Sequence, residues 1–168
     1  MSCSATCSRE SESLFPDVSP GVVEGDEDVS RAAFSPFHFK KAGGLKNSFV
    51  KSSDLKKGDL SVWRLRYCAN ELEEILSSSC PAGSELHSAY PCTASAIRGQ
   101  RIEGHEGRVF CVVDDCRIDS DGNVHSAHAA IGIACELNPQ DLDTESPQFL
   151  LIRDLLVNLF KSRQPQTF

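Results

Sequence analysis

Two apolar runs on either side of a short polar turn constrain the fold of this chain more than any other feature. Residues 108–113 are rich in β-branched and aromatic side chains, which favours a strand. Residues 119–123 are dense in turn-forming residues. Residues 124–135 are apolar again and favour a second strand, although their alanines also permit a helix. The sequence therefore predicts a hairpin over residues 108–136.

The register of this hairpin determines which polar side chains meet. Pairing Ile118 with Val124 across the turn puts Asp114 opposite His128. A carboxylate beside an imidazole orients the ring and favours its charged form, as a general acid or base requires. Asp114 and His128 are therefore the candidate catalytic residues. The alternative is a buried structural pair, and a register slip of one residue would separate the two side chains.

The same register puts Arg117 opposite His125. If residues 124–135 were a helix instead, His125 and His128 would share a face, and two such histidines can ligate a metal. The residues that could complete such a site are His105, Cys111, Cys116 and Cys135. The chain has no Cys-x-x-Cys motif, so we predict no metal site. It also has no Gly-x-Gly-x-x-Gly or Walker motif, so we predict no cofactor.

The remaining patterns indicate an α+β fold. Residues 48–51 and 60–65 are expected to form short strands. Apolar residues at helical spacing predict a helix over 68–79. Ser146 as the N-cap and Pro147 at the first helical position predict another over 147–162. We expect a small, mostly antiparallel sheet with the hairpin at its centre and two or three helices packed on it.

Charge divides the chain into segments. Residues 1–30 are polar and acidic, which predicts a tail that is disordered when free. We expect a single domain over residues 31–163 and a C-terminal tail over 164–168. The net charge of −7 argues against general nucleic-acid binding. Residues 40–66 are basic and could hold an anionic ligand. The candidate anion-binding residues are Lys56, Lys57, Arg64, Arg66 and, from a polar loop, His105.

The eight cysteines raise the question of disulfides. A chain of 168 residues can bury a core without them. The N-terminus has no positive start followed by an apolar run, and no stretch has the roughly 20 apolar residues that span a bilayer. We therefore predict free thiols, a cytoplasmic location and no membrane contact.

The last predicted helix is apolar on more than one face, which predicts a second contact surface and hence a protein partner or a homo-oligomer. The candidate interface residues are Leu151, Leu155, Val157 and Phe160. The first hypothesis is therefore a soluble intracellular accessory or interaction protein, such as a subunit or inhibitor in a larger assembly. The alternative is a small enzyme that acts on an anionic or nucleotide-like substrate with the Asp114/His128 pair.

Overall fold

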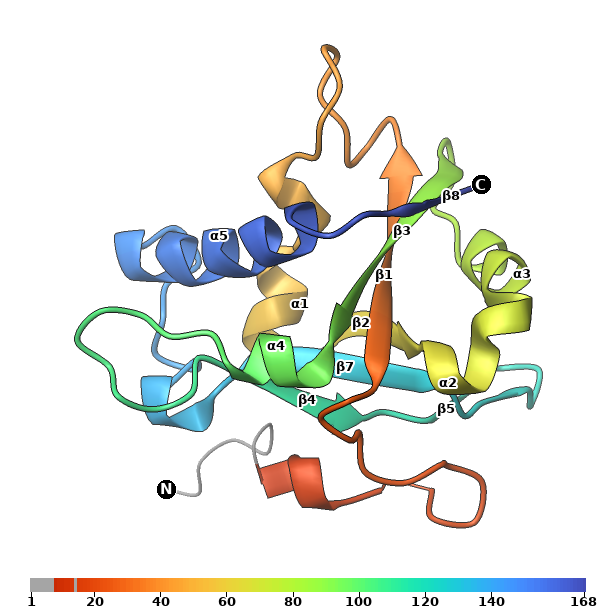
Figure 1. The fold of residues 1–168 in the computed structure, drawn as a ribbon, viewed down its shortest axis with the longest axis horizontal. Helices are drawn as coiled ribbons and strands as arrows, with labels where there is room; N and C mark the ends of the chain where they lie inside the picture. Colours follow the sequence, from red (N-terminus) through yellow and green to blue (C-terminus); the bar gives the residue numbers. More distant parts are fainter. Residues whose placement is uncertain (1–7, 14) are drawn as a thin grey trace.

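The computed structural model describes residues 8–13 and 15–168, and these residues form an α+β domain around an antiparallel six-stranded sheet (Figure 1). This confirms the predicted fold class. The strands, in their order across the sheet, are β4 (Phe110–Asp114), β7 (His128–Ile133), β2 (Leu60–Arg64), β1 (Asp28–Ser35), β3 (Glu85–Thr93) and β8 (Gln166–Thr167). A second, two-stranded sheet pairs β5 (Arg117–Ile118) with β6 (Val124–His125).

Helices cover both faces of the large sheet (Figure 1). The α-helices are α1 (Ser52–Lys57), α2 (Leu65–Cys68), α3 (Leu72–Ser78), α4 (Ala94–Arg98) and α5 (Pro147–Lys161). The 3₁₀ helices are η1 (Ser8–Ser11), η2 (Asn47–Phe49), η3 (Ala69–Glu71) and η4 (Cys135–Leu137). The main core packs α1, α4 and α5 on one face of the sheet, and a smaller cluster packs α2 and α3 on the other. None of the described helices is long and apolar enough to cross a membrane.

Residues 124–135 form strands rather than a helix, so the strand prediction is confirmed. The hairpin lies at one side of the sheet, with β4 outermost, rather than at the centre. Its outer edge is nevertheless protected from solvent: the Val112 N–H donates to Oε1 of Glu10 (2.9 Å), and the Val112 carbonyl accepts from Arg98 (2.9 Å). This cover explains why an edge strand can be apolar on both faces.

The hairpin does not keep one register throughout. At its tip Arg117 pairs with His125, as the sequence predicts. Nearer the base, Asp114 pairs with Ala129 instead of His128. The second arm therefore carries one residue more than the first between these two pairs, as in a β-bulge, and the extra residue changes which side chains meet.

β1 and β2 pair only at one end. They pair through Val29 with Arg64 and Ser30 with Trp63, while β1 continues alongside β3 as far as Ser35. Beyond Trp63 toward the start of β2 the two strands diverge, and Figure 1 shows β1 rising away from β2. Along this stretch a gap in strand pairing lies between the β4–β7–β2 part of the sheet and the β1–β3–β8 part.

The chain on either side of the predicted domain joins this fold. The predicted boundary at residue 31 lies inside β1, and Val23 and Glu27 before it are buried. The predicted C-terminal tail contributes β8, which pairs with β3. The prediction that residues 1–30 are disordered when free stays a prediction, and residues 1–7 and 14 lie outside the described part of the chain.

Candidate functional site

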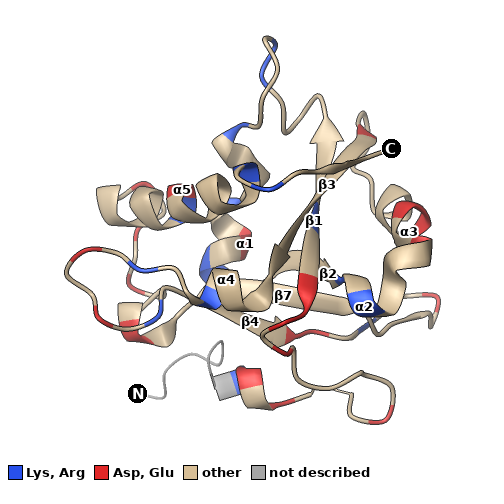
Figure 2. Ribbon diagram, viewed as in Figure 1, with Lys and Arg blue, Asp and Glu red and all other residues tan. Residues whose placement is uncertain are grey.

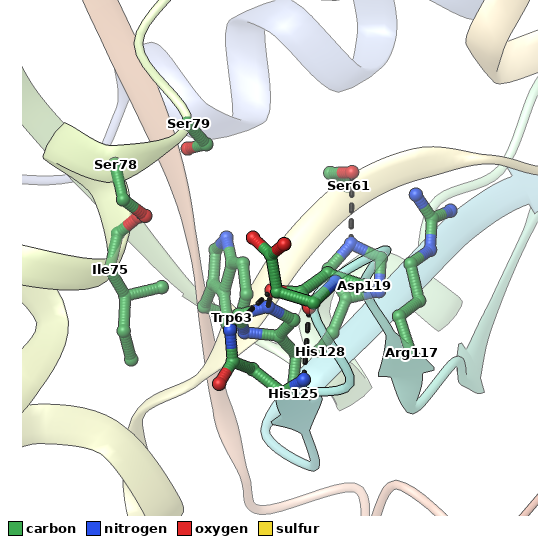
Figure 3. A pocket seen from close by; sticks show the side chains of 11 residues that line it. Ser61, Trp63, Ile75, Ser78, Ser79, Arg117, Asp119, His125 and His128 are labelled. Carbon is green, nitrogen blue, oxygen red and sulfur yellow. Dashed lines mark hydrogen bonds and ion pairs between the residues drawn. The ribbon is translucent and has the colours of Figure 1, made fainter.

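A cavity of about 630 Å³ lies on the α3 face of the sheet (Figure 3). Its floor is formed by β2 and β7, its walls by the end of α3 and by the β5–β6 hairpin. Alternation along β2 buries Leu60, Val62 and Arg64 and leaves Ser61 and Trp63 facing this cavity. Several polar side chains of the described chain converge on this cavity, which makes it the candidate functional site.

His128 is the central polar group of the floor, and 3% of it is exposed. Its Nδ1 lies 2.8 Å from the backbone oxygen of Asp115 and 3.2 Å from Oδ2 of the same residue. Its Nε2 lies 2.9 Å from Oγ of Ser61. The ring of Trp63 packs edge-on against the imidazole, with centroids 5.0 Å apart. Each nitrogen of His128 therefore has a partner, and the ring is held in one orientation.

The tautomer of His128 follows from these partners. A carbonyl oxygen can only accept a hydrogen bond, so Nδ1 carries a proton and donates it to Asp115. In the neutral ring Nε2 is then an acceptor, and the Ser61 hydroxyl donates to it. The direction of this hydrogen-bond chain is the one that lets a histidine remove a serine proton.

Asp115 is buried to 7% exposure, and two arginines also contact its carboxylate. Arg117 lies 2.7 Å from Oδ2, and Arg9 donates to Oδ1 at 3.2 Å. Burial alone would raise the pKa of Asp115. The hydrogen bond from His128 and the charges of His128 and Arg117 outweigh burial and lower this pKa from 3.8 to about 2. The carboxylate therefore stays ionised at neutral pH and can stabilise a protonated His128.

The rim of the cavity is organised by Asp119. Its Oδ1 accepts the backbone N–H groups of Asp121 and Asn123, both at 2.9 Å, and its Oδ2 accepts from the Asn123 amide at 3.0 Å. The Asn123 hydrogen bonds lower the pKa of Asp119 to about 2. His125 lies 3.1 Å from the same Oδ2. Asp119 and Asp121 thus give this end of the cavity a negative charge.

Asp114 does not meet His128 in the structure, which corrects the predicted pairing of these two residues. It faces the other side of β4, where its Oδ1 lies 3.4 Å from Nη1 of fully buried Arg64. Ser13 donates to Oδ2 at 2.7 Å, and Ser19 donates to the same oxygen. Arg64 is held further by Glu27, 2.6 Å from Nη2. The carboxylate that faces His128 is Asp115, because the register shift turns Asp114 away from the cavity.

The predicted anion-binding residues do not meet at the cavity. The ribbon in Figure 2 shows the basic residues of segment 40–66 spread over the loop after β1, over α1 and near α2. Arg64 is in the core, and Arg66 pairs with Asp26 at the surface (3.1 Å). Lys56 donates to the backbone oxygen of Leu142 at 2.6 Å, Lys57 is exposed, and His105 contacts the backbone oxygen of Arg108 at 3.1 Å. The cation that lines the cavity is Arg117, which the sequence had paired only with His125.

The predicted interface residues of α5 are divided between surface and core. Leu151 is 57% exposed, and Leu155 is half-buried against the core. Val157 and Phe160 are completely buried within this domain. The second apolar face of α5 therefore packs largely on the sheet and its connecting segments, and these last two residues are not available to a partner.

The cysteines are not all free thiols. Cys111 and Cys135 each take part in a disulfide bond, which corrects the prediction for these two positions. The free thiols of the described chain are Cys68, Cys80, Cys92 and Cys116, and Cys3 and Cys7 lie outside it. Spacing along the sequence does not reveal which thiols meet in space. Disulfides are most common in oxidising compartments, so they do not favour the predicted cytoplasmic location.

Residues 8–13 and 15–168 contain no cluster of histidine, cysteine and acidic side chains that could hold a metal ion. Comparisons of the chain with protein-family models, with curated proteins and with solved structures find no match. Sequence reasoning missed Ser61 and Asp115. The alternation of residues 60–65 could have indicated that Ser61 shares the face of Trp63, but no local pattern marks Asp115.

Proposed function

We propose that this protein is a small enzyme that transfers or hydrolyses acyl groups, with Ser61 as the nucleophile, His128 as the general base and Asp115 as the group that orients His128. The single observation that carries the proposal is the hydrogen-bond chain from Ser61 through His128 to Asp115 on the floor of the 630 Å³ cavity. This is a form of the enzyme alternative raised by the sequence, with Asp115 in place of Asp114.

The proposed chemistry follows from the direction of the hydrogen bonds. As Oγ of Ser61 attacks a carbonyl carbon, Nε2 of His128 takes the hydroxyl proton, and the Asp115 carboxylate stabilises the imidazolium that forms. His128 then returns the proton to the leaving group, and an acyl-Ser61 intermediate remains. A water activated by His128 releases the acyl group in the second half of the reaction.

Arg117 is the group best suited to stabilise the developing negative charge. Among the described residues that line the cavity, it is the only lysine or arginine, and Figure 3 shows it beside His128. Its Nε and Nη2 contact Oδ2 of Asp115 at 2.9 and 2.7 Å. A guanidinium presents five donors, so further N–H groups remain for a substrate oxygen. Arg117 would then link the orienting carboxylate to the reacting group.

A purely structural role for the same residues is the competing explanation, because a buried histidine usually has hydrogen-bond partners. Two features favour catalysis over this explanation. The Ser61 hydroxyl borders a cavity that can admit a ligand, instead of being enclosed by packed side chains. The ionised Asp115 is also held by two arginines, Arg9 and Arg117, which is more than a simple structural pair needs.

The accessory or interaction role stays a prediction. It was inferred from the apolar residues of the last helix, and two of these, Val157 and Phe160, are buried within the domain. A protein partner, a homo-oligomer and a cytoplasmic location likewise stay predictions.

The proposal is tested by hydrolysis of a simple activated ester, p-nitrophenyl acetate, by the whole chain. We expect Ser61→Ala and His128→Gln each to lower kcat/KM by at least about 10³-fold, because the two residues act as one unit. Ser79→Ala is the matched control, because Ser79 lines the same cavity and its hydroxyl donates to the Leu76 carbonyl at 3.0 Å. Equal activity in all three variants, or no activity in the wild type on any acyl ester, would exclude the proposed role of Ser61.

A further inference from the structure

A second cavity, of about 320 Å³, opens where β1 and β2 diverge. It shares Ser61, Trp63 and Ser79 with the first cavity, so both cavities border the proposed nucleophile. We refer to these two adjoining cavities as the cleft, and Ser61 is among the residues that they share. A substrate bound at Ser61 would therefore place one part beside the β5–β6 hairpin and the other part in the gap between β1 and β2.

Arg31 lies in this gap, next to Ser61. Its Nη1 donates to the Ser61 backbone oxygen at 2.7 Å, and its Nε donates to the Phe49 oxygen at 2.9 Å. The guanidinium also lies over the Phe49 ring, 5.4 Å from the centroid. These contacts bridge the two strands where their ladder has stopped. They also hold the guanidinium rigidly, with part of it lining the second cavity.

The charge of Arg31 is not neutralised by an ion pair within the described part of the chain. Arg9, Arg64, Arg98 and Arg117 each contact a carboxylate directly, whereas Arg31 has only the more distant charge of Asp54. Burial lowers the pKa of Arg31 to about 10, so the group is still cationic at neutral pH. An uncompensated guanidinium that borders a cavity gains free energy when an anion enters.

The other charged groups of the second cavity leave it positive. Lys51 lines it and lies 3.2 Å from Asp54, so these two charges balance. Burial and the charges of Arg31 and Lys46 lower the pKa of His38 to about 4, which keeps this ring neutral near pH 7. Arg31 therefore supplies the net charge. The opposite end of the cleft carries Asp119 and Asp121, so the two ends differ in sign.

We propose that the second cavity binds an oxyanion, a carboxylate or a phosphate, carried on the substrate, with Arg31 as the residue that determines specificity and Lys51 as a weaker contributor. The proposal rests on the proposed function for its link to catalysis, because it places this anion on one side of the ester bond that Ser61 attacks. Binding of the anion itself does not require Ser61 to react. The forked guanidinium of arginine commonly binds a carboxylate or a phosphate through two hydrogen bonds.

The binding test uses the full chain with Ser61→Ala, titrated with inorganic phosphate or with glutarate and followed by calorimetry. The two titrants distinguish phosphate from carboxylate, and saturable binding of either one supports the proposal. Arg31→Lys should weaken binding about tenfold through loss of the forked donors, which corresponds to about 1.4 kcal/mol. Lys51→Met should weaken it severalfold, and Lys57→Met, an exposed lysine outside the cavity, should leave it unchanged.

The kinetic test compares p-nitrophenyl acetate with the mono-p-nitrophenyl ester of glutaric acid, which adds a carboxylate to the acyl part. The wild type should prefer the anionic ester by about tenfold or more in kcat/KM, and Arg31→Lys and Lys51→Met should reduce this preference. Absence of binding by both titrants, or equal effects of Lys51→Met and Lys57→Met, would overturn the inference. Anion binding that depends on Arg31 in a chain without esterase activity would instead uphold the inference and defeat the proposed function.

Discussion

Asp115, and not its neighbour Asp114, is the acidic residue that meets His128, and it does so with two oxygens: its backbone oxygen lies 2.8 Å from Nδ1 and its Oδ2 lies 3.2 Å away. The backbone contact alone fixes the proton on Nδ1. The carboxylate adds charge stabilisation for the protonated ring. The orientation of His128 and the stabilisation of its charge are thus supplied by different groups of one residue.

This division of roles predicts the effect of Asp115→Asn. The backbone oxygen would still hold the tautomer of His128, so the variant should keep more activity than Ser61→Ala or His128→Gln. We expect kcat to fall between about tenfold and about 10³-fold, less than the roughly 10⁴-fold typical when a triad aspartate is lost. Steady-state ester hydrolysis measures the loss. Asp121→Asn, on the rim of the same cavity, is the control and should change kcat little. A loss as large as that of Ser61→Ala would contradict the separate roles.

The pH dependence of stability provides a second prediction. The pKa of Asp115 in the folded protein, about 2, is below its ordinary value of 3.8. The folded state therefore binds this proton less readily than the unfolded state. The resulting stabilisation is fully present above pH 4 and is lost as the pH falls from about 4 to about 2. Urea unfolding at several pH values should show a shallower decline for Asp115→Asn than for the wild type. Parallel curves would show that Asp115 is not held by His128 and Arg117.

The ion pairs of Arg64 and Arg66 predict very different effects on stability. Arg64→Met would leave the buried carboxylates of Glu27 and Asp114 without their partner, so we expect a loss of about 3–5 kcal/mol in the free energy of unfolding. Arg66→Met removes only a solvent-screened surface pair with Asp26 and should lower the free energy of unfolding far less than Arg64→Met. Denaturant unfolding of both variants measures the difference. Similar small losses would mean that Arg64 is not held as described.

The burial of α5 predicts which of its apolar residues matter for folding. Phe160→Ala should lower the free energy of unfolding by about 3–5 kcal/mol, because the side chain is fully buried against the ring of Phe49. Leu151→Glu should change it by less than about 0.5 kcal/mol. Sedimentation of both variants at micromolar concentration checks the oligomeric state. If Leu151→Glu dissociates an oligomer while the monomer stays folded, the interaction hypothesis regains support from this one exposed residue.

The fold class could be predicted from sequence because it depends on local signals. The turn at residues 119–123 fixed the pairing of Arg117 with His125, and Ser146 and Pro147 fixed the start of α5. The site could not be predicted to the same extent. A single extra residue between His125 and Ala129 exchanged Asp114 for Asp115, and no pattern in the sequence marks such a bulge.

The long-range contacts of the site could not be predicted from sequence either, because they depend on which distant strands pair. Ser61 meets His128 only because β2 lies beside β7, although the two residues are far apart along the chain. The apolar second face of α5 suggested a partner, yet the chain itself covers Val157 and Phe160. Periodicity indicates that a face must be buried but not what buries it.

Whether His128 activates Ser61 is tested most directly by labelling the whole chain covalently with a fluorophosphonate, which reacts with activated serines, and mapping the label by peptide mass spectrometry. We predict one phosphonylated residue, Ser61, with labelling abolished in His128→Gln and retained in Ser79→Ala. Labelling of a different serine, or Ser61 labelling that is unchanged in His128→Gln, would contradict the claim that His128 activates Ser61.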